Sequence, residues 1–66
     1  MTDAAMCRAM GWNPGSVLEN VEHPEQRILI TAIGLDLVLG RRLGEGAEEV
    51  VRLAEGRWRL AGYAPF

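Results

Sequence analysis

The residues of this 66-residue chain that offer the most chemistry are its seven basic side chains, all of which are arginine. A guanidinium group binds carboxylate and phosphate oxygens through paired hydrogen bonds, which a lysine ammonium cannot do. A predicted hairpin with its turn at Glu55–Gly56 places Arg52 opposite Arg59, with Arg57 on the same outer face. Like charges that face each other across two strands repel, so this face requires a compensating negative charge.

Two interpretations of this arginine face remain open. In the first, glutamate or aspartate side chains interleave with the arginines, and the face is simply solvated. In the second, the arginines bind the phosphates of a small anionic nucleotide while an aromatic ring stacks on its base. The residues predicted for this anion site are Arg41, Arg42, Arg52, Arg57, Arg59 and Trp12, with Trp58 or Tyr63 as further stacking partners.

No motif in the sequence predicts catalysis. His23 is the only histidine and has no visible partner, and Cys7 is the only cysteine, so neither an internal disulfide nor a cysteine-based zinc site can form. Nucleophile elbows, phosphate-binding loops and paired carboxylates at a defined spacing are missing from the sequence. We therefore predict a protein that is not an enzyme, with no catalytic residues, no metal site and no cofactor.

Composition narrows the classes of partner. The formal charge of −2 and the pI near 5.2 argue against nucleic acid, which a binding protein usually meets with a basic surface. With 48% hydrophobic residues the chain is too apolar to be disordered, yet a domain this small buries only about 60% of its unfolded surface. Self-association, or another protein partner, would cover the excess apolar surface.

The sequence predicts a cytoplasmic protein without a membrane segment. A lone cysteine suits a reducing compartment, and residues 1–15 carry charges where a signal peptide would be apolar. The apolar run from Ile28 to Leu39 contains Asp36 and is shorter than the roughly 20 residues that a membrane span needs.

The stretch from Arg27 to Arg42 organises the predicted fold. Its β-branched residues suit a pleated strand better than a helix, and Gly34–Leu35 fits a two-residue II′ turn. This predicts strands over residues 27–33 and 36–42. One buried helix over residues 24–43 is the alternative, which the glycines in this stretch disfavour.

The two-residue turn pairs Ile33 with Asp36 and sorts the side chains onto two faces. The predicted core face carries Ile28, Ile30, Ala32, Leu37 and Leu39. The opposite face is unusually apolar for a solvent face, and we predict that Leu29, Ile33 and Val38 form an interface there.

The rest of the chain adds a short helix over residues 2–10 and three further strands over 16–22, 49–54 and 57–61. Residues 46–55 could instead form a helix, since their glutamates and alanines are comfortable in one. One helix followed by about five short strands predicts a single domain over residues 1–66. Its class is mainly β (α+β), a small, strongly bent antiparallel sheet or an SH3-like, partly open barrel.

Four segments resemble a family of small uncharacterised phage and prophage proteins. These segments are GWNPGSVLE (Gly11 to Glu19), RILITAIG (Arg27 to Gly34), VLGR (Val38 to Arg41) and GRWRL (Gly56 to Leu60). The family pattern differs in the loop before the second segment, here 20–26, and in a polar position that is Leu29 here. The resemblance implies a β-rich fold and a viral origin, but no activity.

Three functions follow as predictions. The first is a small interaction module that self-associates. The second is a viral oligomer that sequesters a negatively charged nucleotide signal through the arginine cluster, and the third is a small barrel that binds nucleic acid weakly.

Overall fold

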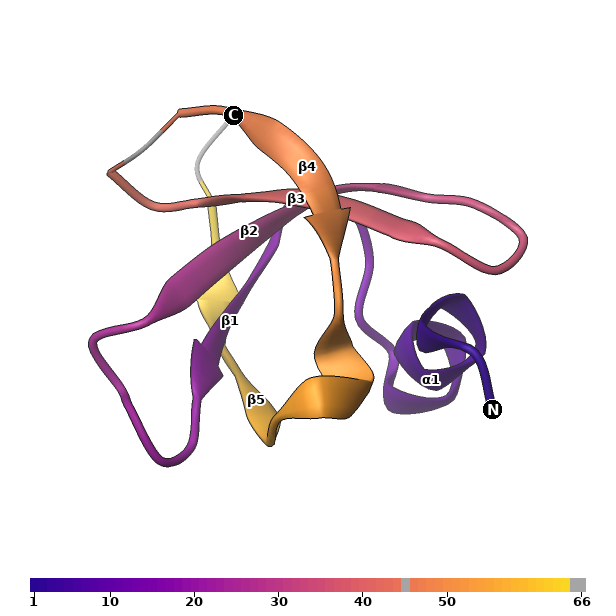
Figure 1. The fold of residues 1–66 in the computed structure, drawn as a ribbon, viewed down its shortest axis with the longest axis horizontal. Helices are drawn as coiled ribbons and strands as arrows, with labels where there is room; N and C mark the ends of the chain where they lie inside the picture. The colour runs from indigo at the N-terminus through magenta and orange to yellow at the C-terminus, as the bar shows by residue number, and fades with distance from the viewer. Residues whose placement is uncertain (45, 65–66) are drawn as a thin grey trace.

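The computed structural model describes residues 1–44 and 46–64, which form one α-helix and a five-stranded antiparallel sheet (Figure 1). The helix and strands are α1 (Asp3–Met10), β1 (Ser16–Asn20), β2 (Arg27–Ile33), β3 (Val38–Arg42), β4 (Glu48–Val51) and β5 (Trp58–Tyr63). The order across the sheet is β4-β3-β2-β1-β5, so β5 returns to the free edge of β1. The predicted mainly β, α+β class is confirmed.

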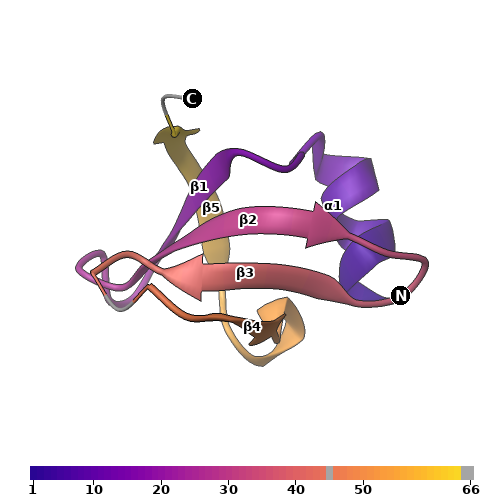
Figure 2. The same cartoon turned by 90° about the horizontal axis from the view of Figure 1, so that it is seen from above.

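The sheet is bent but does not close into a barrel. Figure 2 shows β5 crossing behind β2 and β3 at a steep angle, while β2 and β3 run side by side. The edge strands β4 and β5 are connected by a short 3-10 helix, Leu53–Glu55, and are not paired with each other in the sheet. One side of each edge strand is therefore left without a neighbouring strand.

Helix α1 begins and ends where its capping residues predict. The Thr2 hydroxyl accepts the Ala5 backbone N–H at 3.1 Å, and Gly11 ends the helix with a left-handed φ of 74°. Ala4 and Cys7 are fully buried against the sheet. The helix therefore packs as a lid on one end of the sheet, as Figure 2 shows.

The core lies between the sheet's inner face and α1. Leu18 from β1, Ile30 from β2 and Val38 from β3 are completely buried, and Leu53 of the 3-10 helix adds to them from the chain that links β4 to β5. Fully burying one such side chain stabilises the fold by about 1.5–3 kcal/mol. A short connection thus contributes to the core as much as a strand does.

The predicted two-residue turn at Gly34–Leu35 is wrong. Ile33 pairs with Val38 rather than with Asp36, so the turn spans four residues, and β3 begins at Val38 instead of at residue 36. The Arg8 guanidinium donates to the carbonyl oxygens of Gly34 and Leu35, both at 3.2 Å. The wider turn is therefore held by α1, a contact that local turn preferences do not include.

A β-bulge also changes the predicted faces of this hairpin. Ile30 pairs with Gly40 and Ala32 with Leu39, so Thr31 is an extra residue on β2. The alternation of side chains shifts by one after the bulge. Val38, predicted on an outer face, is consequently in the core, and Leu37, predicted in the core, is 61% exposed.

The predicted interface of Leu29, Ile33 and Val38 is therefore wrong as a single exposed face. Val38 is completely buried, and Ile33 packs against the core cluster. Leu29 is 6% exposed but lies outside that cluster. These three side chains cannot together cover a partner, because they belong to different faces and expose little surface.

The second predicted hairpin, residues 49–54 with 57–61, is also wrong. Strand β4 pairs with β3, and β5 pairs with β1, so Arg52 does not face Arg59. A type I′ turn requires positive φ, whereas Gly56 has a φ of −152°. The Asp3 carboxylate accepts the backbone N–H groups of Leu53 and Ala54 at 3.1 and 3.2 Å.

This contact explains the local structure, because it supplies acceptors for the first N–H groups of the 3-10 helix. Residues 46–55 are accordingly neither one strand nor one helix. The first predicted strand, 16–22, ends at Asn20 for a similar reason. The Asn20 side chain accepts the backbone N–H groups of Glu22 and His23, which turns the chain away from β1.

Candidate binding cleft

A cleft of about 400 Å³ lies where the sheet stays open. Its walls come from β4, the 3-10 helix and the start of β5, and from residues of β1, β2 and β3 next to the β1–β2 and β3–β4 connections. Ile28, Val51 and Trp58 supply apolar lining, and Val50 lines the cleft while remaining 46% exposed. The volume falls within the roughly 300–1,000 Å³ range of small-molecule sites.

The polar lining of the cleft is a mixture of amides and paired charges. Arg42 lies 3.7 Å from Glu49, and Arg52 lies 3.9 Å from Glu55, with all four side chains more than half exposed. Exposed pairs of this kind contribute about 0–1 kcal/mol to stability. Each arginine at the cleft thus has a carboxylate beside it, so the cleft does not present a concentrated positive field.

Trp58 carries the one buried side-chain nitrogen or oxygen without a hydrogen-bond partner in the described part of the chain, its indole Nε1. Leaving such a donor unpaired costs about 1–3 kcal/mol. Trp58 pairs across the strands with Asn20, whose amide also lines the cleft. An unpaired donor in a cleft wall is a feature that a ligand acceptor would satisfy.

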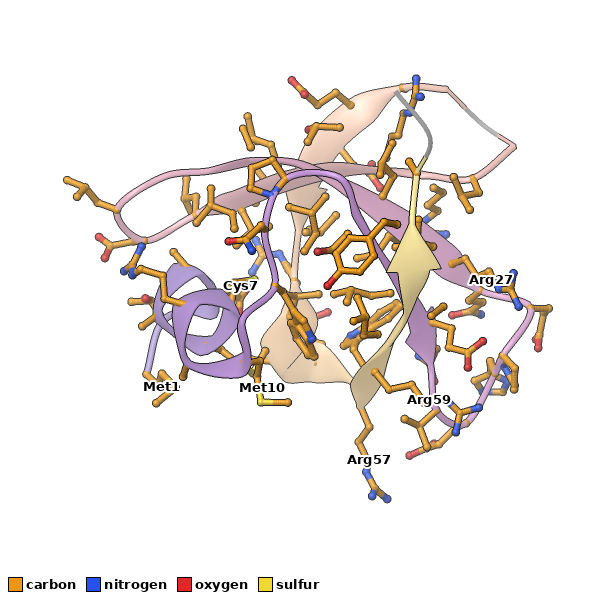
Figure 3. The ribbon with its side chains drawn as sticks, turned by 180° about the vertical axis from the view of Figure 1, so that it is seen from behind. Met1, Cys7, Met10, Arg27, Arg57 and Arg59 are labelled. Carbon is orange, nitrogen blue, oxygen red and sulfur yellow. The ribbon has the colours of Figure 1, made fainter. Side chains whose placement is uncertain are left out.

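The six residues of the predicted anion site are not brought together. Arg59 donates to Glu19 at 2.6 Å, and Arg27 approaches the same carboxylate at 3.5 Å from the neighbouring strand. Figure 3 shows Arg57 extending away from the body of the molecule, apart from Arg59 and Arg27. The repulsion between Arg52 and Arg59 that motivated the anion site does not arise, because their strands are not paired, and Arg59 is instead compensated by Glu19.

The remaining members of the predicted site lie elsewhere. Trp12 is 4% exposed in the core and cannot stack on a base. Arg42 is paired with Glu49 at the cleft, and Arg41 faces Glu48 across β3 and β4. Only Arg42 and Arg52 of the six line the cleft, so the predicted nucleotide site is wrong as a cluster.

The groups that could carry proton-transfer chemistry are isolated from one another. Cys7 is buried, and burial raises the pKa of its thiol, with the Asp3 carboxylate adding to the rise and Arg8 opposing it. His23 lies 3.7 Å from Glu25, with both side chains exposed in the β1–β2 connection. Within residues 1–44 and 46–64, no group of three or more histidine, cysteine, aspartate or glutamate side chains could hold a metal ion.

Sequence reasoning missed the cleft because its walls are distant in the chain. Asn20 and Trp58 meet only because β5 pairs with β1, and no local pattern announces that pairing. The one sequence feature that marks the cleft is Gly56, which comes directly before an arginine and a tryptophan. The predicted hairpin placed this glycine in its turn.

These features define a small, mainly β domain with one open five-stranded sheet and a cleft at the opening. The chain matches the model of a family described as a domain of unknown function (DUF7241) over residues 1–63, and it belongs to that family. No curated protein and no solved structure matches it. In the part of the chain that the structure describes, no helix is long and apolar enough to cross a membrane.

Proposed function

We propose that this protein is a small non-enzymatic interaction module that binds an extended segment of a partner polypeptide in the cleft between β4 and β5. The observation that carries the proposal is an open sheet edge beside a cleft of about 400 Å³. An edge strand presents backbone N–H and C=O groups that can pair with an added strand. Strand addition is a common mode of peptide recognition, in which backbone pairing gives affinity and side-chain pockets give specificity.

The composition of the cleft supports a polypeptide better than a nucleotide or nucleic acid. Its apolar lining includes Ile28, Val51 and Trp58, which suits side chains of an extended segment. The two arginines that line it are each beside a glutamate. Phosphate recognition depends on cations that are free to neutralise it, whereas these are already compensated.

Self-association remains part of the proposal, with a second copy of the chain as the alternative occupant of the same edge. Strand β4 carries Val50, which is 46% exposed. It also carries Glu48 and Glu49, and in an antiparallel pair of two β4 strands the glutamates of one copy need not lie opposite those of the other. A viral origin and a host or viral partner rest on the motif resemblance. An SH3-like description rests on the bent, open sheet with a 3-10 helix before its last strand.

The test begins with the subunit count and then selects a ligand. Light scattering on the purified chain shows whether a dimer forms, and a dimer that Val50→Asp abolishes would identify a second copy as the occupant. A displayed library of random peptides is then selected on the chain, and the tightest peptide is mapped by amide chemical shifts. We expect the shifts to concentrate on β4, the 3-10 helix and Trp58.

Backbone methylation of the selected peptide tests strand addition directly. Only every second residue of an added strand points its N–H and C=O toward β4, so methylating alternate nitrogens should weaken binding about tenfold and the others little. Val50→Asp at the cleft should also weaken binding. Its matched control is Leu35→Asp, at a position 87% exposed in the β2–β3 turn. Shifts that map away from the cleft, or no selectable peptide, would contradict the proposal.

A further inference from the structure

Trp58 and Asn20 are the starting point of an inference that rests on the proposed function and deepens it. The two residues face each other across β5 and β1. Both line the cleft, and Trp58 Nε1 is buried without an acceptor. A buried donor that stays unpaired in the free protein gains a full hydrogen bond when a ligand supplies the acceptor.

The amide of Asn20 is oriented by the backbone next to it. Its Oδ1 accepts the N–H groups of Glu22 and His23 at 2.9 and 3.1 Å. Because the amide group is planar, fixing the oxygen also fixes the direction of Nδ2, which has two protons to donate. Among the described residues no acceptor is bonded to this nitrogen, so Asn20 offers a second oriented donor.

Gly56 lies close to both of these donors. A Cβ atom at Gly56 would lie 3.3 Å from Trp58 Nε1 and 3.4 Å from Asn20 Nδ2. The backbone of Gly56 is extended, with φ −152° and ψ −175°, a conformation that any residue adopts. Glycine is therefore not needed here for its backbone freedom. Its missing side chain leaves the two nitrogen donors uncrowded, because a Cβ atom at these distances would be in unusually tight contact with both.

The charges around this position favour a neutral acceptor over an anionic one. Arg52, which lines the cleft, lies 3.9 Å from Glu55 and is compensated by it. Arg57 adjoins Gly56 in the chain, but it extends away from the body of the molecule (Figure 3). Glu25 also lines the cleft and adds negative charge. A carboxylate or phosphate would meet repulsion there, whereas a carbonyl oxygen needs only the two N–H donors.

We infer that Trp58 Nε1 and Asn20 Nδ2 form a two-donor subsite beside Gly56 that binds one backbone carbonyl oxygen of the partner polypeptide. The subsite adjoins the start of β5, across the cleft from edge strand β4. A segment that lies along β4 would therefore be held on both sides, by backbone pairing on one and by a shared carbonyl on the other. This fixes the register of the segment, since only one carbonyl can occupy the two-donor position.

The experiment follows the two indole N–H signals of the nitrogen-15-labelled chain, which Trp12→Phe assigns. The probe is N-acetylalanine N-methylamide, a blocked residue with two amide carbonyls and no charge, and acetate is the anionic comparison. We expect the amide to move the Trp58 indole proton downfield while the Trp12 signal stays in place. Acetate at equal ionic strength should move it less. An unmoved Trp58 signal, or a larger response to acetate, would overturn the carbonyl subsite.

Three substitutions then test the subsite against the peptide selected from the library. Trp58→Phe removes one donor. Asn20→Asp removes the other while keeping the oxygen that accepts the N–H groups of Glu22 and His23, and Gly56→Ala crowds both positions. Each should weaken the peptide about fivefold to tenfold, whereas Trp12→Phe should not. Variants whose thermal unfolding matches the parent but which bind the peptide unchanged would overturn the inference. A peptide that still mapped to the cleft would leave the proposed function standing.

Discussion

The α1 end and the cleft end of the molecule differ in how their polar groups are satisfied. At the α1 end, Arg8 donates to two carbonyl oxygens of the β2–β3 turn, and Asp3 accepts two N–H groups of the 3-10 helix. At the cleft end, Trp58 Nε1 has no acceptor, and its close neighbour Gly56 has no side chain to offer one. In a chain of 66 residues, where total stability is on the order of 3–10 kcal/mol, an unpaired buried donor is a substantial cost.

This contrast favours the cleft over the arginines as the binding surface that we propose. Surface arginines with carboxylate neighbours, such as Arg59 with Glu19, hold strands together. The cleft instead combines an unpaired strand edge with an unpaired donor. Pairing the strand edge and the donor within the chain would make the fold more stable. Leaving both unpaired is what a binding surface requires.

The largest expected effect comes from placing an aspartate at a buried valine of β3, compared with the same change at an exposed valine of β4. Val38 is completely buried, so Val38→Asp would place an unpaired carboxylate in the core at a cost of several kcal/mol. We expect this variant to be unfolded by circular dichroism at ambient temperature. Val50→Asp, at a position 46% exposed on β4, should change the free energy of unfolding by less than about 1 kcal/mol. A Val38→Asp variant that melted like the parent would show that the bulged register of β2 and β3 is wrong.

A second comparison sets two extended glycine sites against each other. A Cβ at Gly40 would lie 2.7 Å from the backbone oxygen of Leu29, so Gly40→Ala must push β2 and β3 apart and should cost about 2 kcal/mol. At Gly56 the nearest atoms are side-chain nitrogens at 3.3 and 3.4 Å, and alanine also reduces the freedom of the unfolded chain. We expect Gly56→Ala to shift the free energy of unfolding by less than about 0.5 kcal/mol.

Chemical denaturation of the two variants measures this difference. Equal losses at both positions would mean that the side chains of Trp58 and Asn20 are held as rigidly as the backbone of Leu29, and the carbonyl subsite would lose its basis. A loss confined to Gly40→Ala would show that the packed hairpin and the cleft tolerate added volume differently.

Local signals predicted the elements that depend on neighbours in the sequence. Thr2 and Gly11 mark the ends of α1 because capping is a contact within one turn of helix. Strand β2 has the predicted bounds of 27 and 33, since its β-branched run is continuous. The β-rich class followed from the same features.

The errors arose where distant segments override local preference. Arg8 is 26 residues from Gly34 in sequence and still stabilises the wider turn. Asp3 stabilises the 3-10 helix from 50 residues away, where Glu55–Gly56 alone resembled a hairpin turn. The cleft could not be predicted, because Asn20 and Trp58 become neighbours only through the pairing of the first strand with the last.

The smallest expected effect concerns the thiol of Cys7, which reports opening at the α1 end. Burial, aided by Asp3, raises the pKa of this thiol above its ordinary value of 9.0, and the thiolate is the reactive form. Iodoacetamide should therefore label the native chain at least about a hundredfold more slowly than the unfolded chain. The matched control is the double variant Cys7→Ala with Ala54→Cys, whose exposed thiol should react at the rate of a free cysteine.

The raised pKa also gives the free energy of unfolding a slope with pH. Below pH 9.0 the thiol is protonated in both states, and its contribution is fully present. Above that value the unfolded chain releases the proton first, so stability should fall as the pH rises toward the folded pKa of Cys7. Denaturation at a series of alkaline pH values measures this slope, which Cys7→Ala should remove. A Cys7 that reacted as fast as the Ala54→Cys control, with no such slope, would mean that α1 does not close its end of the sheet. The difference between the two ends of the molecule would then disappear.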